Sequence, residues 1–360
     1  MHDIPILMLH TVNSQKTLNP LGELSVSPKG LEAYCKVFKK WKYQMISMQE
    51  FLENKYDKNR NFVILTFDDG YKDNLTVACS ILKKYDAHAT IFINPEYLSD
   101  ESDPYSDWGF MTWDEVIEAE NCGTFDIQAH TMTHEFTFIS DSIIDYYTPE
   151  KFDKYYWLAW MLFPDSPRKW NGKAYSYRNK IPTGYPIFEY GRRIANRKFI
   201  PDPQYVTYLI EKYQNSYADE KQYNGSHGLY EDENHYNEYI IWEIVECKRI
   251  IEEKLKKKVT TLCFPGGGYD EYSLKLAQQS GYQCYMIASK MREGNNYEHL
   301  KNIEEGIFDG FNRTAFSLIH PGFLPDHLFD KWIAKLSLGA YQNMPLYVFL
   351  KKVLSKIWHT

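Results

Sequence analysis

Short apolar segments alternate with helix-like segments along most of this 360-residue chain, and this alternation constrains the fold more than any other feature. Continuous apolar segments are typical of parallel strands, which are covered on both faces. The predicted strands are Ile4–Leu9, Val63–Phe67, Ala89–Ile93, Phe125–Ala129, Val259–Phe264, Gln283–Ala288 and Thr314–Ile319. The predicted helices are Pro28–Trp41, Asn74–Tyr85, Thr112–Glu120, Asn237–Lys257, Glu271–Gly281 and Pro325–Leu338. This order predicts an α/β fold, a distorted seven-stranded (β/α) barrel, one strand short of the usual eight.

A large insertion interrupts the alternation after the fourth predicted strand. It spans residues 140–236, far more than an ordinary connection, and is rich in Tyr, Trp, Arg and Pro. We therefore predict a barrel of residues 1–139 and 237–340, an insertion or lid, and a tail of residues 341–360. Because the insertion leaves the barrel after a strand end, we expect it to cover that face; a decoration with its own small core is the alternative. The candidates to shape a pocket are Trp157, Trp160, Trp170, Tyr185 and Arg192.

The composition argues against a nucleic-acid partner and for a reducing environment. The net charge is −7, and no block of Lys and Arg stands out. The six cysteines lack short pair spacings and lie mostly in apolar segments, which is typical of reduced, buried thiols. The N-terminal sequence "MHDIPILMLHT" has no basic region before its apolar run, so we expect a strand and no signal peptide. These features predict a cytoplasmic protein.

The C-terminal sequence "MPLYVFLKKVLSKIWHT" combines apolar residues with three lysines. A basic amphipathic helix of this kind can lie in a membrane interface, here at the inner face of the membrane. It can equally pack on the barrel or on a second subunit. Both alternatives stay open on the sequence, as does the oligomeric state.

Polar side chains gather just past the ends of the predicted strands. The residues concerned are His10, Asp68 and Asp69, Asn94, His130 with His134, Pro265 with three following glycines, and His320. In a parallel barrel the carboxyl ends of the strands form one face, where active sites lie. We therefore expect these side chains to meet there.

Each of these motifs is weak alone, but together they predict a metal centre. Asp-Gly is a common turn, and two histidines four residues apart share a face only if "HTMTH" turns helically. One carboxylate and two imidazoles, however, make a divalent-metal site with open positions. In an extended backbone adjacent side chains point in different directions, so Asp69 can bind metal while Asp68 acts as a base. Gly70 would let the chain turn without a Cβ in the way.

The motifs "TFDDGY", "HTMTH", "FPGGGY" and "LIH", in this order, resemble those of polysaccharide deacetylases, the NodB-homology domains of carbohydrate esterase family 4. The lead-in "IPILMLHTV" and "SVSPKGLEAYCKVFKKWKYQMISMQEFL" resembles the subgroup that acts on poly-N-acetylglucosamine-type polymers. The resemblance covers residues 1–135 and about 237–335. It leaves out the insertion.

This resemblance implies a role for each matching residue. Asp68 would be the general base, and Asp69, His130 and His134 would bind a divalent ion, in the family typically zinc. The motif with Pro265, Gly266 and Tyr269 would contribute to oxyanion and substrate binding, with the Gly266 N–H facing the oxyanion. His320 would be the general acid and Leu318 would line the acetyl pocket; His10 is the alternative histidine facing the site.

Two positions depart from the family pattern. The family often has Arg two residues before the motif proline, where this chain has Cys263, and Tyr after the proline, where it has Gly266. We therefore expect Asp68 to lack its usual arginine partner and the site to be more open.

The sequence thus predicts a metal-dependent hydrolase that removes an N-acetyl group from an amino sugar or glycan. A non-catalytic sugar-binding module on the same barrel is one alternative. A non-haem iron oxygenase is another, since two His and a carboxylate also bind Fe(II), but the alternation of strands and helices argues against its usual jelly-roll sheet. Without a signal peptide, small sugars, nucleotide sugars or lipid-linked glycans fit better than an extracellular polymer.

Overall fold

The computed structural model describes residues 4–12, 25–98, 109–163, 174–215, 223–287, 295–313 and 326–341, with 344, 346–347 and 349–350. The strands are β1 (Ile6–Leu9), β2 (Gln44–Ile46), β3 (Phe62–Asp69), β4 (Ala89–Ile93), β5 (Phe125–Ala129), β6 (Phe136–Tyr146), β7 (Pro186–Arg192), β8 (Phe199–Pro201), β9 (Gly228–Tyr230), β10 (Thr261–Cys263), β11 (Cys284–Ile287) and β12 (Asp309–Asn312). The helices are α1 (Pro28–Lys40), α2 (Met48–Leu52), α3 (Cys79–Lys84), α4 (Trp113–Asn121), α5 (Phe152–Tyr155), α6 (Trp157–Leu162), α7 (Pro203–Gln214), α8 (Glu233–Ile241), α9 (Cys247–Leu255), α10 (Glu271–Gln279), α11 (Asn296–Glu304) and α12 (Asp326–Tyr341).

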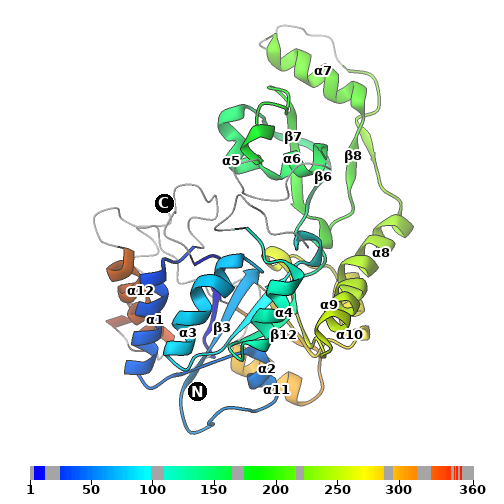
Figure 1. The fold of residues 1–360 in the computed structure, drawn as a ribbon. Helices are drawn as coiled ribbons and strands as arrows, with labels where there is room; N and C mark the ends of the chain where they lie inside the picture. Colours follow the sequence, from blue (N-terminus) through cyan, green and yellow to red (C-terminus); the bar gives the residue numbers. More distant parts are fainter. Residues whose placement is uncertain are drawn as a thin grey trace.

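The core of the molecule is a nearly closed barrel of parallel strands, in the order β1-β3-β4-β5-β10-β11-β12. The short strand β2 pairs with the start of β3, also in parallel. Helices surround the strands on the outside (Figure 1). The strands β3, β4 and β5 are buried along almost their whole length, as their apolar sequences predict. The predicted distorted seven-stranded (β/α) barrel is confirmed.

The last barrel strand that the structure describes lies before the predicted one. We expected it at Thr314–Ile319, which lies outside the described residues, and the structure has β12 at Asp309–Asn312. The sequence of β12, "DGFN", lacks an apolar run, so the pattern of hydrophobicity does not reveal it. The helix α11, which precedes β12, was not predicted either.

Asn296 closes the seam between β1 and β12, which do not pair in the described residues. Its amide nitrogen donates to the carbonyl oxygens of Ile4, at 2.9 Å, and Asn312, at 2.8 Å. Its amide oxygen accepts from the N–H of Asn312 at 2.8 Å. One buried side chain thus satisfies backbone groups of both edge strands, which the open seam would otherwise leave unpaired.

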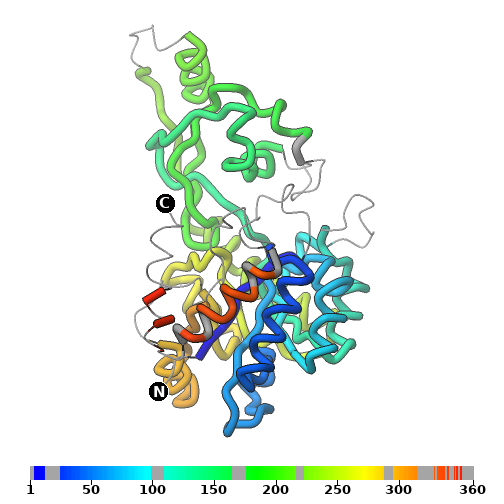
Figure 2. The backbone as a smooth tube through the Cα atoms, turned by 90° about the vertical axis from the view of Figure 1, so that its left-hand side faces the viewer, coloured from blue at the N-terminus to red at the C-terminus, as the bar shows by residue number. Residues whose placement is uncertain are grey.

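Helix α1 shows how local sequence places the outer layer. Ser27 caps its N-terminus by accepting the N–H of Gly30 at 3.0 Å, and Pro28 occupies the first turn. The face with Leu31, Tyr34 and Phe38 is buried against the strands. Helix α12 lies alongside α1 (Figure 2).

The insertion is built on an antiparallel pair of strands, β6 and β7, with α5 and α6 between them in the chain. It carries its own apolar core, which includes Phe138, Trp157, Phe188 and Tyr205, and it stands beyond one end of the barrel (Figure 1). Trp157, Trp160 and Tyr185 are buried members of this core, and that they shape a substrate pocket stays a prediction. Trp170 lies outside the described residues. The division into domains at residues 140 and 236 stays a prediction.

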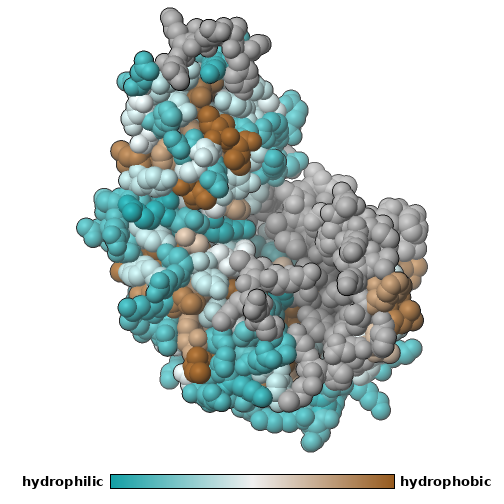
Figure 3. All heavy atoms as spheres, turned by 180° about the vertical axis from the view of Figure 1, so that it is seen from behind, coloured by the Kyte–Doolittle hydropathy of each residue, from teal (hydrophilic) through white to brown (hydrophobic). Residues whose placement is uncertain are grey.

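Exposed apolar side chains gather on the outer part of the insertion (Figure 3). Ile144, Ile200, Leu229 and Tyr230 are among them. Single exposed apolar residues are normal on a protein surface, so they define no site by themselves.

The C-terminal segment starts against the barrel. The Tyr347 ring meets the Trp41 ring edge-on, with the ring centroids 6.1 Å apart. Residues 351–360, with most of the predicted amphipathic tail, lie outside the described residues. Of the helices that the structure describes, none has the length and apolar character needed to cross a membrane.

Candidate active site

The two carboxylates of the "FDDG" motif stand at the carboxyl end of β3, where the backbone turns. Asp69 has φ +77° and Gly70 also has φ +77°. A Cβ on Gly70 would lie 2.9 Å from Cγ2 of Ile93, so this turn requires glycine. Asp69 is therefore in the left-handed region and not in the extended backbone that we expected. An aspartate held in that conformation is strained by about 1 kcal/mol or more, which is typical of functional sites.

Asp68 is paired with Arg313, the residue that follows β12. The guanidinium binds both carboxylate oxygens, with Nη1 2.5 Å from Oδ1 and Nη2 2.8 Å from Oδ2. Both side chains are almost completely buried. The expectation that Asp68 lacks an arginine partner is wrong, because the arginine comes from a different strand end than in the family pattern. We missed it because β12 itself was not predicted.

This pairing keeps the Asp68 carboxylate ionised. Burial by itself would raise the pKa of Asp68, but the charge and the hydrogen bonds of Arg313 hold it below the ordinary value. Asp68 is therefore suited to accept a proton near neutral pH.

The "HTMTH" segment is a loop and not a helix, so the helical reasoning for the two histidines is wrong. Thr131 has φ +62°, and the amide nitrogen of Asn94 donates to the carbonyl oxygens of His130, Thr131 and Thr133. Glu243 accepts the N–H of Thr133 at 2.9 Å from the other side. These contacts bring His130 and His134 together, with ring centroids 5.3 Å apart.

Glu243 is a buried residue that the sequence reasoning missed. It lies in a π-helical turn, Trp242–Glu246, between α8 and α9, and also hydrogen-bonds the hydroxyls of Thr133 and Tyr239. Burial raises its pKa to about 7. Its role is to hold the histidine loop. Only packing brings it next to Thr133, since the two are 110 residues apart in sequence.

The hydrogen bonding of His130 fits a bound cation. Its Nδ1 lies 2.8 Å from the carbonyl oxygen of Cys263, which fixes the proton on Nδ1 and leaves a lone pair on Nε2. That Nε2 is buried without a hydrogen-bond partner among the described residues, 3.5 Å from Oδ1 of Asp69. A lone pair facing a carboxylate oxygen is unfavourable unless a cation lies between them.

Asp69, His130 and His134 complete this cation site. One ligand atom from each lies within 4.8 Å of the others. A second possible set, Asp68 with His130 and Cys263, fits less well. The carboxylate of Asp68 already binds the guanidinium of Arg313, and burial raises the pKa of the Cys263 thiol well above its usual value, which disfavours the thiolate that a metal needs. The donor types of the first set, two imidazoles and a carboxylate, suit zinc or a related divalent ion.

The glycine motif forms a short turn, Pro265–Gly267, beside the histidines. Gly266 has φ +57°, and its N–H donates to no acceptor in the described part of the chain. Pro265 is buried and starts the turn. The Tyr269 ring packs on Phe264, at 5.4 Å, and on Tyr285, at 5.7 Å, so its described ring contacts are packing contacts.

Of the two predicted candidates for the general acid, the structure describes only His10. This side chain is buried, and its Nε2 lies 3.9 Å from Oδ2 of Asp68. His320 and Leu318 lie outside the described residues, so their roles stay predictions.

A family model for polysaccharide deacetylases matches residues 55–155 and 211–285, which hold the aspartate, histidine and glycine motifs. The chain belongs to the polysaccharide deacetylase family. This is the family of NodB-homology domains, carbohydrate esterase family 4. The residues 156–210 between the two matched parts lie within the insertion.

One curated relative of this family member is YxkH of Bacillus subtilis, whose name assigns it provisionally to the polysaccharide deacetylases. The two are 31% identical over 134 residues, which are 36% of this chain and 43% of YxkH. The match therefore spans less than half the length of the relative.

Solved structures of deacetylases share the fold of this family member. One is the Streptococcus pyogenes deacetylase PplD in complex with acetate, with 18% identity, a TM-score of 0.50, and coverage of 91% of this chain and 97% of PplD. Another is a de-N-acetylase from Aggregatibacter actinomycetemcomitans, with 16% identity, a TM-score of 0.53, and coverage of 91% and 99%. At these identities the likeness concerns the fold.

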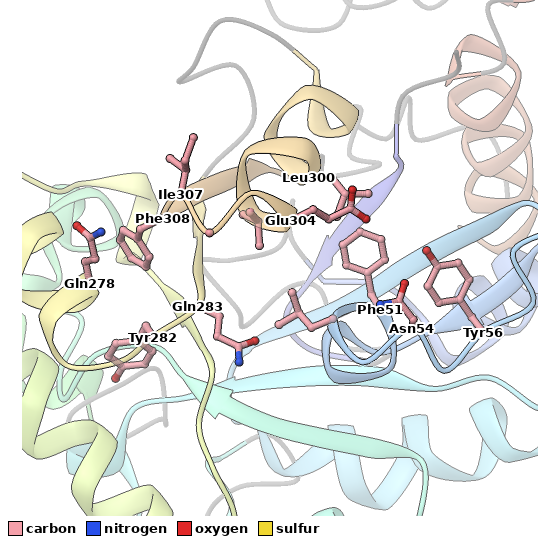
Figure 4. A pocket seen from close by; sticks show the side chains of 13 residues that line it. Phe51, Asn54, Tyr56, Gln278, Tyr282, Gln283, Leu300, Glu304, Ile307 and Phe308 are labelled. Atoms are coloured by element: carbon pink, nitrogen blue, oxygen red, sulfur yellow. The ribbon is translucent and has the colours of Figure 1, made fainter.

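Two cavities of this family member lie at the opposite, amino end of the strands. One of about 430 Å³ is lined by Phe51, Gln283 and Phe308 among others (Figure 4). The other, of about 490 Å³, shares Tyr56 and Glu304 with it. Neither is lined by a predicted site residue, so neither marks the catalytic centre.

Proposed function

We propose that this protein is a metal-dependent hydrolase that removes the N-acetyl group from an amino sugar or glycan. The observation that carries this proposal is that two adjacent carboxylates at one strand end have different surroundings. Asp68 is held ionised by Arg313, and Asp69 faces the lone pair of His130 beside His134. The first suits a base and the second a cation ligand.

Asp69, His130 and His134 would hold the ion. A divalent ion there would act as a Lewis acid that polarises the acetamido carbonyl group and makes water more acidic. The carbonyl oxygen of Cys263 orients His130 for this role through Nδ1. Asn94 and Glu243 fix the loop that carries both histidines.

The chain's own residues account for the proton transfers. Asp68 takes a proton from the attacking water as the water oxygen adds to the carbonyl carbon of the acetamido group. The electron pair of the C=O bond then moves onto the oxygen, which the free N–H of Gly266 can stabilise. A histidine must protonate the departing amine; His320 and His10 are the two candidates. When the C–N bond breaks, acetate and a free amino sugar result.

Arg313 tunes the base, and its substitution gives a pH-dependent prediction. Arg313→Lys keeps the charge but loses the bidentate contact, which raises the pKa of Asp68. The acid limb of the pH profile of kcat/KM should therefore move to higher pH by roughly one unit. An acid limb that stays in place in Arg313→Lys would show that the arginine does not control Asp68.

The same pair also stabilises the fold. Since the pKa of Asp68 is lowered in the native state, its contribution to stability is present above the unfolded-state pKa of about 3.9 and is lost as the pH falls through the native value. Arg313→Ala should lower the free energy of unfolding by about 3–5 kcal/mol near neutral pH, because it leaves a buried carboxylate unpaired. Denaturant unfolding measures this.

The substrate class is part of the proposal. The names of the two structural neighbours, a deacetylase in complex with acetate and a de-N-acetylase, support acetate as the product. We propose small N-acetylated sugars, nucleotide sugars or lipid-linked glycans in the cytoplasm, where the six unpaired cysteines would stay reduced. Contact of the C-terminal tail with the membrane belongs to the same proposal.

A panel of substrates tests the function. Zinc-loaded protein is incubated with N-acetylglucosamine oligomers, nucleotide-linked and lipid-linked N-acetylamino sugars, and O-acetylated sugars, and acetate and free amine are measured together. We expect equal amounts of both from at least one N-acetylated substrate. Tight binding without acetate would favour the sugar-binding alternative. Consumption of oxygen with a 2-oxoacid would favour the oxygenase.

A further inference from the structure

One arginine of the insertion, Arg192 at the end of β7, lies in the candidate active site. Its Nη1 lies 2.8 Å from Nδ1 of His134, and its guanidinium lies over the Phe136 ring, 3.9 Å from the centroid. Its side chain also runs along the glycine turn. A Cβ on Gly266 would lie 2.6 Å from Nε of Arg192, and a Cβ on Gly268 would lie 2.9 Å from Cβ of Arg192.

Arg192 has no counter-charge within ion-pairing distance among the described residues. The two arginines that are fully buried do: Arg193 pairs with Glu231 and Arg313 with Asp68. Arg192 is partly buried and has only the charge of Asp69 near it in the described part of the chain, and a divalent ion bound to Asp69 and His134 would use that charge and add a second positive charge beside the guanidinium. An anion next to Arg192 would relieve both. The place where the acetamido oxygen gains negative charge is such a position.

The contact with His134 cannot persist in the metal-loaded protein. The guanidinium can only donate, so Nδ1 of His134 must accept with its lone pair. If the ion binds Nδ1, that lone pair is used. If the ion binds Nε2, the neutral ring carries its proton on Nδ1, which then cannot accept. In either case Arg192 must leave His134 when the ion binds.

We propose that Arg192 is a catalytic residue supplied by the insertion: it releases His134 on metal binding and then hydrogen-bonds the acetamido oxygen as that oxygen becomes negative. Gly266 supports this assignment, because a side chain there would occupy the space of the guanidinium. The family pattern has Tyr at this position, and a Tyr side chain there would exclude the Arg192 guanidinium from its observed place. The inference rests on the proposed de-N-acetylation.

The first test measures metal binding without any substrate. Zn²⁺ is titrated against a chelating dye in wild type, Arg192→Ala and Arg192→Met, the latter keeping an unbranched side chain over Phe136. We expect both variants to bind Zn²⁺ roughly tenfold more tightly, since a charged competitor for His134 is gone. Arg178→Ala removes an exposed arginine of the same insertion and should match wild type. Unchanged or weaker Zn²⁺ binding in both Arg192 variants would overturn the competition with His134.

The second test measures catalysis at saturating Zn²⁺. Arg192→Ala should lower kcat by about 10²-fold or more with a small change in KM, because one oxyanion donor is lost. Added guanidinium chloride at millimolar concentration should restore part of kcat in Arg192→Ala and none in wild type. Wild-type kcat in Arg192→Ala, or loss without rescue, would overturn the catalytic role.

Gly268→Ala gives an independent check. The new Cβ would lie 2.9 Å from Cβ and 3.0 Å from Cγ of Arg192. The backbone of residue 268 has φ −76°, a conformation that alanine adopts without strain. We expect Gly268→Ala to lower kcat in wild type and to have no further effect in Arg192→Gly, which also lacks the Cβ that the new methyl group would meet. Additive losses would contradict the proposal. If wild type releases no acetate from any substrate, the proposed function fails, and the Zn²⁺ titration still decides whether Arg192 competes for His134.

Discussion

Asp68→Asn is expected to lower kcat for de-N-acetylation by a factor of about 10³ or more, while the protein still binds one divalent ion. Asparagine cannot take a proton from water, but it has nearly the size of aspartate. The ligands Asp69, His130 and His134 remain in place. Initial rates of acetate release, with metal content measured on the same sample, test this.

The control must lose a buried ion pair without touching the site. Asp126 is also almost completely buried and accepts from Lys257 at 2.7 Å, at the amino end of the barrel. Asp126→Asn should lower stability yet keep wild-type kcat. Full activity in Asp68→Asn would exclude Asp68 as the base.

His134→Ala is expected to lose both the metal ion and the activity. Two ligands, Asp69 and His130, bind a divalent ion far more weakly than three, so the purified variant should contain much less than one ion per chain. Elemental analysis of the dialysed protein measures this. His235→Ala, which removes an exposed histidine on α8, should keep the wild-type metal content. Stoichiometric metal in His134→Ala would show that the ligand set is wrong.

The sequence predicts those parts of the barrel where local pattern and burial agree. The strands β3, β4 and β5 are continuous apolar runs because helices cover the outside and side chains fill the inside. The strand β12 has the sequence "DGFN", and it holds its place partly through the side chain of Asn296, which no periodicity reveals. Missing β12 also hid Arg313 as the partner of Asp68.

The site was predictable where its residues directly follow strands. Asp68, Asp69, His130 and His134 meet at one face because the carboxyl ends of parallel strands meet there. The geometry between them was not predictable, since Asp69 and Thr131 both take left-handed conformations. Glu243 and the position of Arg192 depend on packing between segments far apart in the chain.

The most direct test of the account is acetate release by one preparation in three states: as purified, after removal of metal with a chelator, and after return of one equivalent of Zn²⁺. The account predicts activity on an N-acetylated sugar in the first state, loss of at least about 95% of that activity in the second, and recovery in the third. The expected loss is large because removing one group that stabilises the transition state typically costs roughly 10²-fold or more in rate. Undiminished acetate release from the metal-free protein would contradict the account.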